Sequence, residues 1–379
     1  MKKIFVLSVG RSDYDRYYPI ISELNKLKKV KLWLCLTRSH QEKIFGNTIN
    51  YISKEFKIIR NKHYSKKSFK SDIAKNFSDD LFFMGAEIKK KKPDLIIVLG
   101  DRYEMILGPI SAIPYNIPVI HFFGGAVTEG AIDELIRHSI TKMSHYHFVL
   151  LEKYKKRLIK MGEESWRIKT IGMHELTYLK KQKVFKLKYL NKKYNFNFHE
   201  PYILFTLHPT TLELTKLKQQ IKIVEESLKN CKMNVVFTYP NADPGHKQII
   251  NFIKKFKNKK KYLIFKNAGI TLYANLLRNA SFLLGNSSSG IVEAASFKKP
   301  VINLGTRQKG KHIPKNVINC DFNSQKILKS IIKANSKKLR KKISLLKNPY
   351  ESKTNIKDII RLILRIRQND KLLRKKFKD

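Results

Sequence analysis

The chain has 379 residues, of which 42% are hydrophobic. This is enough for two hydrophobic cores, because single cores stop growing at about 250–300 residues. The apolar runs are too short for a membrane-spanning helix or a signal peptide. The net charge of +48 is mostly lysine spread over several runs, without the arginine-rich or aromatic pattern of a sequence-specific nucleic-acid reader, so we expect only non-specific adhesion to polyanions. Three separated cysteines fit neither a disulfide framework nor a metal site, which predicts a cytoplasmic protein without a metal.

Short apolar runs alternate with longer amphipathic stretches, as in βαβ units built around parallel sheets. Strands are predicted in the first half at residues 3–8, 30–37, 95–100, 119–122 and 147–150, and in the second half at 202–207, 234–239, 262–266, 282–285 and 300–304. A lysine-rich connection over residues 179–200 separates the two series, and an amphipathic pattern over 355–376 predicts a terminal helix.

These elements predict an α/β fold class with two Rossmann-like, doubly wound parallel-sheet domains. The first domain is expected to comprise residues 1–172 plus the C-terminal helix at 355–379, and the second, nucleotide-binding domain residues 173–354. Doubly wound sheets bind ligands at the carboxyl ends of their strands, so the loops after strands should carry the chemistry, in a cleft between the domains.

Two loops of the first domain place charged residues at such strand ends. Arg11 follows strand 3–8, where a guanidinium can hold phosphate oxygens with two hydrogen bonds. Asp101 and Arg102 follow strand 95–100, as a carboxylate and a cation at the ligand edge. A structural salt bridge is the competing interpretation of this pair.

A glycine-rich loop over residues 121–138 carries several acids. Glu129 and Asp133 are four residues apart, which would put both on one side of a helix start, while Glu134 is expected to point elsewhere. Acids in a first helical turn also serve simply as partners of the helix dipole.

The second domain repeats the arrangement. His208 ends strand 202–207 and Asn241 follows strand 234–239. A serine-rich loop after strand 282–285 offers hydroxyl and N–H donors for a diphosphate, and an acid one turn later can accept from ribose hydroxyls. These residues are Ser287, Ser288, Ser289 and Glu293. A plain turn with serine caps is the alternative.

Seven separated motifs together resemble the hydrolysing UDP-N-acetylglucosamine 2-epimerases, over roughly the whole chain. In order they are Gly10-Arg11, Gly100-Asp101-Arg102, Gly124-Gly125 with Asp133 and Arg137-His138, His208-Pro209, Pro240-Asn241, residues 285–290 and residues 305–310. The resemblance implies the two-domain glycosyltransferase-B architecture and a homo-oligomer that binds a nucleotide sugar. It implies no cofactor, no metal, no specific nucleic acid and no membrane partner.

Roles follow from the resemblance position by position. Asp101 and Asp133 match the catalytic carboxylates of the family, and His208 matches its cleft histidine. The positions that match nucleotide-binding residues are Arg11, Arg102, Asn241, Ser287, Ser288, Glu293 and Arg307.

The chain departs from the family pattern beside its glycine pair. The family carries a carboxylate just before or just after the glycines, where this chain has Phe123 and Ala126. Glu129 is expected to substitute as a third catalytic acid, as in members that read Thr-Glu-Gly.

The implied reaction releases UDP and N-acetylmannosamine from UDP-N-acetylglucosamine by elimination and hydration, for sialic-acid-type sugar biosynthesis. A UDP- or GDP-linked diacetamido-trideoxyhexose of a legionaminic-acid-type pathway is a second possible substrate. The sequence also leaves open a non-hydrolysing epimerase, a glycosyltransferase of the same architecture, an inactive nucleotide-sugar binder and a polyanion-binding protein.

Overall fold

The computed structural model describes residues 1–37, 40–41, 48–62, 73–129, 132–241 and 243–378. By their contacts these residues form two compact units. Unit 1 comprises Met1–Ala126, Asp133–Thr177 and Tyr350–Asp379, and unit 2 comprises Val127–Ile132 and Tyr178–Pro349. Compared with the predicted domain ranges, the junctions are shifted, and the short segment Val127–Ile132 groups with unit 2 although its neighbours along the chain belong to unit 1.

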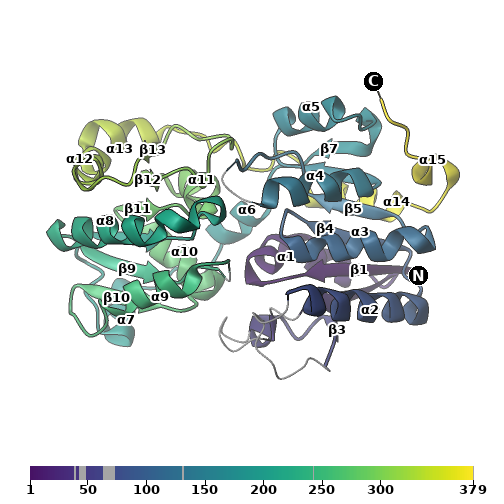
Figure 1. Cartoon of the computed structure of the whole chain (residues 1–379), viewed down its shortest axis with the longest axis horizontal. Helices are drawn as coiled ribbons and strands as arrows, with labels where there is room; N and C mark the ends of the chain where they lie inside the picture. The colour runs from purple at the N-terminus through teal and green to yellow at the C-terminus, as the bar shows by residue number, and fades with distance from the viewer. Residues whose placement is uncertain (38–39, 42–47, 63–72, 130–131, 242, 379) are drawn as a thin grey trace. The chain divides into compact units, whose positions relative to one another are not determined.

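Unit 1 is built on a seven-stranded, fully parallel sheet with the order β3-β2-β1-β4-β5-β6-β7 (Figure 1). Its strands are β1 (Lys2–Ser8), β2 (Val30–Leu36), β3 (Lys57–Arg60), β4 (Leu95–Leu99), β5 (Val119–Phe122), β6 (Tyr146–Val149) and β7 (Ile168–Thr170). Its helices are α1 (Arg11–Asn25), α2 (Ile73–Lys91), α3 (Leu107–Ala112), α4 (Asp133–Met143), α5 (Glu152–Lys160), α14 (Ile356–Arg365) and α15 (Asp370–Leu373). Helix α6 (Glu175–Lys180) contains the junction with unit 2.

Unit 2 has a six-stranded parallel sheet with the order β10-β9-β8-β11-β12-β13. Its strands are β8 (Tyr202–Thr206), β9 (Asn234–Thr238), β10 (Tyr262–Phe265), β11 (Phe282–Gly285), β12 (Val301–Leu304) and β13 (Val317–Cys320). Its helices are α7 (Leu187–Tyr194), α8 (Leu217–Asn230), α9 (His246–Lys254), α10 (Gly269–Asn279), α11 (Ser288–Val292), α12 (Ser324–Asn335) and α13 (Lys337–Ser344).

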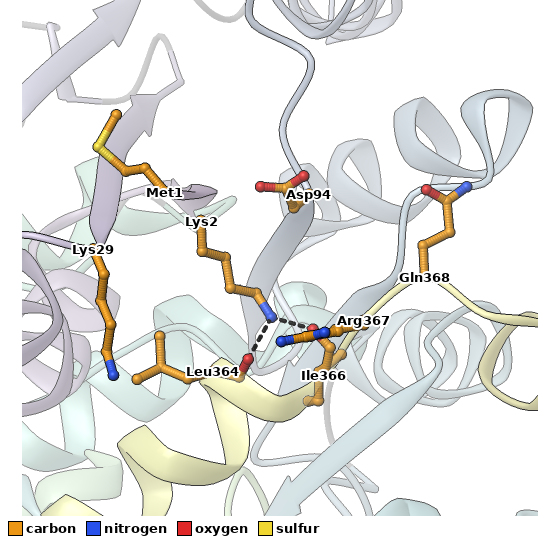
Figure 2. Close-up of a pocket in the computed structure, with 8 residues that line it drawn as sticks. All are labelled: Met1, Lys2, Lys29, Asp94, Leu364, Ile366, Arg367 and Gln368. Carbon is orange, nitrogen blue, oxygen red and sulfur yellow. Dashed lines mark hydrogen bonds between the residues drawn. The ribbon is translucent and has the colours of Figure 1, made fainter.

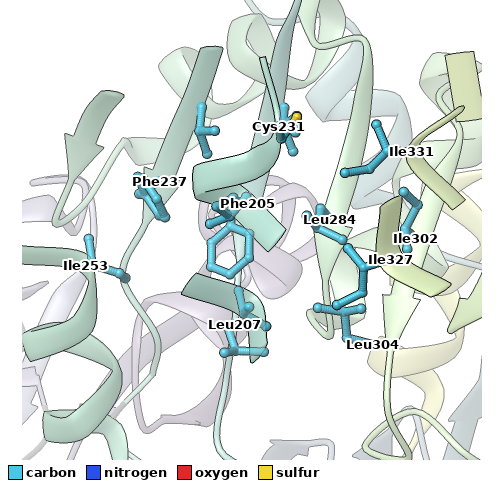
Figure 3. Close-up of a cluster of buried hydrophobic side chains, with 14 of the residues drawn as sticks. Phe205, Leu207, Cys231, Phe237, Ile253, Leu284, Ile302, Leu304, Ile327 and Ile331 are labelled. Carbon is cyan, nitrogen blue, oxygen red and sulfur yellow. The ribbon is translucent and has the colours of Figure 1, made fainter. Parts of the chain in front are cut away.

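The apolar side chains of the strands form the cores. Strand β4 is buried along its whole length, as expected for a central strand covered on both faces. In unit 2, Phe205, Phe237, Leu284 and Ile302 from four neighbouring strands lie in one buried cluster under α8 and α12 (Figure 3). The predicted α/β class with two doubly wound parallel sheets is confirmed.

Two features differ from the expected elements. Strands β3, β7 and β13 were not predicted, because each has only three or four residues and lies at a sheet edge, and two of them have lysine in the run. The single predicted terminal helix is two helices, since the side chain of Asn369 accepts a hydrogen bond from the N–H of Leu372 and starts α15 anew. Figure 1 shows both helices, in yellow, with the elements of unit 1.

Candidate active site

The strand order fixes where each sheet can hold a ligand. In unit 1 the order reverses at neighbouring strands β1 and β4, and in unit 2 at neighbouring strands β8 and β11. Ligands of doubly wound sheets bind beyond the carboxyl ends of such strand pairs. The loops that follow these four strands begin at Val9, Gly100, Leu207 and Asn286, so they carry Arg11, Asp101, Arg102, His208 and the serine loop with Glu293. The other predicted site residues follow the neighbouring strands β5, β9 and β12.

The loop after β1 is fixed by Asp13, which the sequence did not single out. Its buried carboxylate accepts hydrogen bonds from the N–H groups of Val9 and Gly10, both at 2.8 Å, and from the hydroxyl of Ser8 at 2.7 Å. Burial raises the pKa of Asp13. The network holds the backbone from which Arg11 projects, while the side chain of Arg11 itself lies outside the described part of the structure.

The loop after β4 joins Asp101 to helix α4. The guanidinium of Arg137 is fully buried and donates to Asp101 through Nε at 3.1 Å and through Nη2, and to Glu134 through Nη1 at 2.6 Å. Burial acts to lower the pKa of Arg137, but the two carboxylates offset it and hold that pKa above its ordinary value. Asp133, half-buried, is the first residue of the same helix.

Glu134 belongs to this group, contrary to the expectation that it points elsewhere. Besides accepting from Arg137, it accepts a hydrogen bond from Nε2 of His138 at 2.9 Å. The spacing of three and four residues between Glu134 and these partners on α4 is the signal that could have predicted it. The other predicted residue of the β4 loop, Arg102, lies with its Nε 3.5 Å from a carboxylate oxygen of Glu104.

His121 holds the β4 loop from inside the sheet. Its Nε2 donates to the carbonyl oxygen of Gly100 at 2.8 Å, and its Nδ1 lies 3.1 Å from the hydroxyl of Thr141 on α4. Burial lowers the pKa of His121 to about 3, so the ring is neutral with its proton on Nε2. The turn that carries Asp101 is therefore tied to α4 by two routes, through Arg137 and through His121.

The glycine pair after β5 packs against helix α5. Gly125 has a φ of +77°, and a Cβ there would lie 2.8 Å from the carbonyl oxygen of Tyr154. Phe123, one of the two positions at which the family resemblance led us to expect an acid, is buried and also has a positive φ, of 67°. A bulky side chain rarely adopts that conformation, so this part of the loop is strained.

Glu129 contacts Lys309, a residue of unit 2. Its N–H donates to the carbonyl oxygen of Lys309 at 3.1 Å, and its carboxylate pairs with the ammonium of Lys309 at 2.9 Å. The side chain is 48% exposed. Both residues belong to unit 2, so the predicted third acid groups with the unit that carries His208, Asn241 and Arg307.

In unit 2, Asn286 organises the loop that carries His208. Its side-chain amide accepts from the N–H of His208 at 2.7 Å and donates to the carbonyl of His208 at 2.8 Å. The Nδ1 of His208 accepts from the N–H of Asn241 at 3.2 Å, so in the neutral ring the proton sits on Nε2, a hydrogen-bond donor.

Arg307 joins the same cluster through the backbone. Its Nη1 donates to the carbonyl of Asn286 at 3.2 Å, which also accepts from Nε2 of Gln308 at 2.8 Å. The Nη2 of Arg307 lies 3.6 Å from the carboxylate of Asp243. His208, Asn241 and Arg307, three residues far apart in the sequence, thus meet around Asn286.

The serine loop is closely packed. Gly285 needs to be glycine because a Cβ there would overlap the carbonyl oxygen of Thr206. Ser287 caps α11, accepting from the N–H of Ser289 at 3.3 Å, and Ser289 donates to Glu293 at 2.7 Å while accepting from the hydroxyl of Tyr273. Ser289 therefore orients Glu293. Helix α11 after the loop has five residues and is followed by a turn of 3₁₀ helix.

A cavity of about 520 Å³ lies elsewhere, at the amino ends of β1 and β4 (Figure 2). The ammonium of Lys2 enters it and donates to carbonyls at the end of α14, and Lys29, Asp94 and Arg367 line it. We do not assign the substrate there, because parallel sheets bind ligands at the opposite edge. The described residues include no group of three or more His, Cys, Asp or Glu placed to hold a metal, and no described helix has the length and apolarity to span a membrane.

Comparison with known proteins identifies the family of the chain. The model of the UDP-N-acetylglucosamine 2-epimerase family matches residues 22–364. A Campylobacter jejuni protein named GDP/UDP-N,N'-diacetylbacillosamine 2-epimerase (hydrolyzing) is 36% identical over 326 residues, covering 85% of each chain. The Legionella pneumophila UDP-N,N'-diacetylbacillosamine 2-epimerase (hydrolyzing) is 32% identical over 345 residues, covering 89% of this chain and 90% of its own.

Among solved structures, the Neisseria meningitidis UDP-GlcNAc 2-epimerase bound to UDP-GlcNAc shares the fold, with a TM-score of 0.80 at 20% identity, covering 97% of this chain and all of that one. The sequence-based family prediction is confirmed by the family model and by the curated relatives together. The chain belongs to the UDP-N-acetylglucosamine 2-epimerase family of enzymes.

Proposed function

We propose that this enzyme is a hydrolysing 2-epimerase that releases UDP from a UDP-linked 2-acetamido sugar and inverts C2, with UDP-N,N'-diacetylbacillosamine as its substrate. One observation carries the proposal. The reversal point of one sheet gathers acids around Arg137, and that of the other gathers hydrogen-bond donors around Asn286. Acids suit proton transfer at a sugar carbon, and donors suit a diphosphate.

The relatives favour the diacetamido sugar. Two proteins that are 36% and 32% identical carry the name of an N,N'-diacetylbacillosamine 2-epimerase. UDP-N-acetylglucosamine is the second candidate, because the family model bears its name. The product would then enter a legionaminic-acid-type or a sialic-acid-type pathway, respectively.

The first step of the proposed reaction is an elimination. A carboxylate, from Asp101 or Asp133, takes the C2 proton, the electron pair of that bond forms the C1–C2 double bond, and the C1–O bond breaks to release the diphosphate. The C2 proton is barely acidic, so stabilising the leaving group is the main electrostatic task. We assign it to Arg307, to Nε2–H of His208 and to the serine loop, with Arg11 and Arg102 from unit 1.

The second step is a hydration. Water adds to C1 of the glycal, and an acid on the opposite face delivers a proton to C2, which inverts that carbon. Removing the C2 proton from one face of the sugar ring and delivering a proton to the opposite face requires at least two acid/base groups. We propose Asp101, Asp133 and Glu129 as the candidates, with Ser287, Ser288, Glu293 and Asn241 holding the nucleotide and Ser289 fixing Glu293. We also propose a homo-oligomer without a cofactor.

The test is turnover of a substrate panel. Purified protein is incubated with UDP- and GDP-linked N,N'-diacetylbacillosamine and with UDP-N-acetylglucosamine, and the released nucleotide and sugar are identified by NMR. We expect free UDP and a C2-inverted reducing sugar, fastest with the UDP-linked diacetamido substrate. Interconversion of nucleotide sugars without UDP release would contradict hydrolysis, and calorimetric UDP binding without turnover would identify an inactive binder.

A further inference from the structure

The last ten described residues fold back onto unit 1 and contact the end of helix α4. We name Asn369–Lys378, which includes α15, the C-terminal clamp. Its first anchor is Arg167, whose side chain is fully buried and donates to the carbonyl oxygens of Lys371 at 2.9 Å, Leu372 at 2.7 Å and Arg374 at 3.2 Å. A buried guanidinium with this many carbonyl partners fixes the backbone of the clamp.

The second anchor is Lys375, which caps α4. Its ammonium donates to the carbonyl oxygens of Thr141 at 3.2 Å, Lys142 at 2.7 Å and Ser144 at 2.8 Å. The last carbonyls of a helix have no partner within the helix and carry partial negative charge, so a cation there is stabilising.

Glu163 completes the charge balance at this anchor. Its carboxylate is fully buried and lies 2.7 Å from the ammonium of Lys375, 2.9 Å from that of Lys142 and 3.0 Å from Nε2 of His147. A buried carboxylate with three hydrogen-bond donors holds Lys375 in one position, which an exposed ion pair would not do.

The same helix begins with Asp133, one of the proposed catalytic acids, and holds a second, Asp101, through Arg137. Thr141 links the two ends, because its carbonyl accepts from Lys375 while its hydroxyl donates to the carbonyl of Arg137 at 3.1 Å and lies beside His121. Arg137 and His121 in turn hold the turn of Asp101. All of these contacts lie within unit 1.

We propose that the C-terminal clamp sets the position of α4, and that Lys375 is a positioning residue for Asp101 and Asp133. The role in catalysis rests on the proposed function, whereas the hold on α4 does not. Lys375 touches no reacting atom in this account. It acts by fixing the last turn of the helix whose first turns hold the acids.

Three variants of the full chain test the proposal. Lys375→Met removes the ammonium and keeps the aliphatic stem, Lys375→Arg restores a cation, and Lys376→Met is the matched control on an exposed lysine next to it. Hydrogen exchange of the α4 amides reports the clamp directly. We expect exchange at least about tenfold faster in Lys375→Met, with α8 of unit 2 unchanged, and wild-type exchange in Lys376→Met.

Turnover, measured well below the unfolding temperature of each variant, tests whether the position of α4 affects catalysis. We expect kcat of Lys375→Met to fall by about 10- to 100-fold, since misplacing a catalytic group by about 1 Å can cost that much. KM and the Kd for UDP should stay within about threefold, and Lys375→Arg should recover most of kcat.

The outcomes distinguish the hold of the clamp on α4 from the positioning role of Lys375 in catalysis. Unchanged α4 exchange in Lys375→Met would overturn the clamp, whatever the reaction. Faster α4 exchange with wild-type kcat, or an equal loss of kcat in Lys376→Met, would overturn the positioning role. If the wild-type protein turned over no nucleotide sugar, the proposed function would fail, and the exchange measurement would still decide the clamp.

Discussion

Arg137 shares its guanidinium between Asp101 and Glu134, so each carboxylate keeps a fixed geometry when the other is changed. Asp101→Asn should lower kcat by about 10²–10⁴-fold, the usual contribution of a general acid or base. The Kd for UDP should stay within about threefold, since Arg137 still bonds Glu134 and the carbonyl of Ala126 and the fold persists. Steady-state kinetics and calorimetry measure both quantities.

Asp94→Asn is the matched control. Asp94 stands just before β4 and accepts from the N–H of Lys3 at 2.7 Å, at the opposite end of the strand from Asp101. Its replacement should leave kcat within about threefold. Equal losses from the two substitutions would show that Asp101 acts only through folding.

Glu129 calls for a different comparison, because its carboxylate pairs with Lys309. As an acid/base group, Glu129→Gln should reduce kcat by about 10²-fold or more. Lys309→Met breaks the same ion pair and should change kcat by less than about threefold, since an exposed pair contributes at most about 1 kcal/mol. Similar small effects of both variants would remove Glu129 from the catalytic set.

Glu163 should make stability depend on pH. Burial alone would raise the pKa of Glu163, but hydrogen bonds and charge from His147 and Lys375 lower it to about 2 from an ordinary 4.5. The contribution of this carboxylate to the stability of the folded protein is therefore complete above about pH 4.5 and is lost as the pH falls towards 2. Glu163→Gln should lower the free energy of unfolding by about 3–5 kcal/mol at pH 7. The difference from the wild-type protein should become smaller below pH 4.5.

Thermal unfolding of this variant at pH 7, 5, 4 and 3 measures the effect, with the exposed Glu226→Gln as a control for the loss of one charge. If the loss of stability in Glu163→Gln did not change with pH, the negative charge of Glu163 would not contribute to stability.

The sequence predicted the candidate site at the level of motifs but not of partners. Asp101, His208 and Arg307 could be found because each follows a recognisable strand. The role of Asn286 could not be predicted, since it comes from contacts with His208 that only the folded chain brings together. Glu134 was expected to point elsewhere, although its spacing of three and four residues from Arg137 and His138 could have predicted these contacts. Asp13 resembled an ordinary first-turn acid, because nothing in its local sequence shows that Ser8 and two N–H groups converge on it.

At the scale of elements, the glycine loop after β5 depends on close contact with α5. Gly125→Ala should destabilise the protein by about 2–4 kcal/mol, from the left-handed backbone and from overlap with Tyr154. Gly85→Ala lies in the middle of α2, where the added Cβ meets no atom within 4 Å from the described residues beyond its own stretch of helix, and it should stabilise the protein by up to about 1 kcal/mol. Chemical denaturation of both variants measures the difference. Similar changes in both would contradict the packing account.

The presence of the main helices and strands was easier to predict than the residues at which they begin and end. The central strands are continuous apolar runs and were found, whereas β3, β7 and β13 are short, and their pairing with a neighbour rather than their composition makes them strands. Helix α4 was expected from its acids, but its capping by Lys375 joins residues 231 to 234 positions apart in the sequence. Local pattern carries no information about such a contact.

At the scale of the whole molecule, the charge of +48 should give polyanion binding that depends on salt. Lysine contacts to phosphates release counterions, so affinity for an unstructured RNA should fall by about 10³-fold or more between 50 and 200 mM salt. Fluorescence anisotropy with labelled RNA measures the slope. Tight binding that persisted at 300 mM salt would indicate a dedicated nucleic-acid site.

In the proposed reaction, C2 loses its proton and regains one from solvent while UDP leaves. Turnover of the UDP-linked sugar in D₂O, followed by NMR, is the decisive measurement. We expect free UDP and a released sugar with inverted C2 that carries deuterium at that carbon. A released sugar that keeps both its C2 configuration and its C2 proton would rule out elimination and hydration.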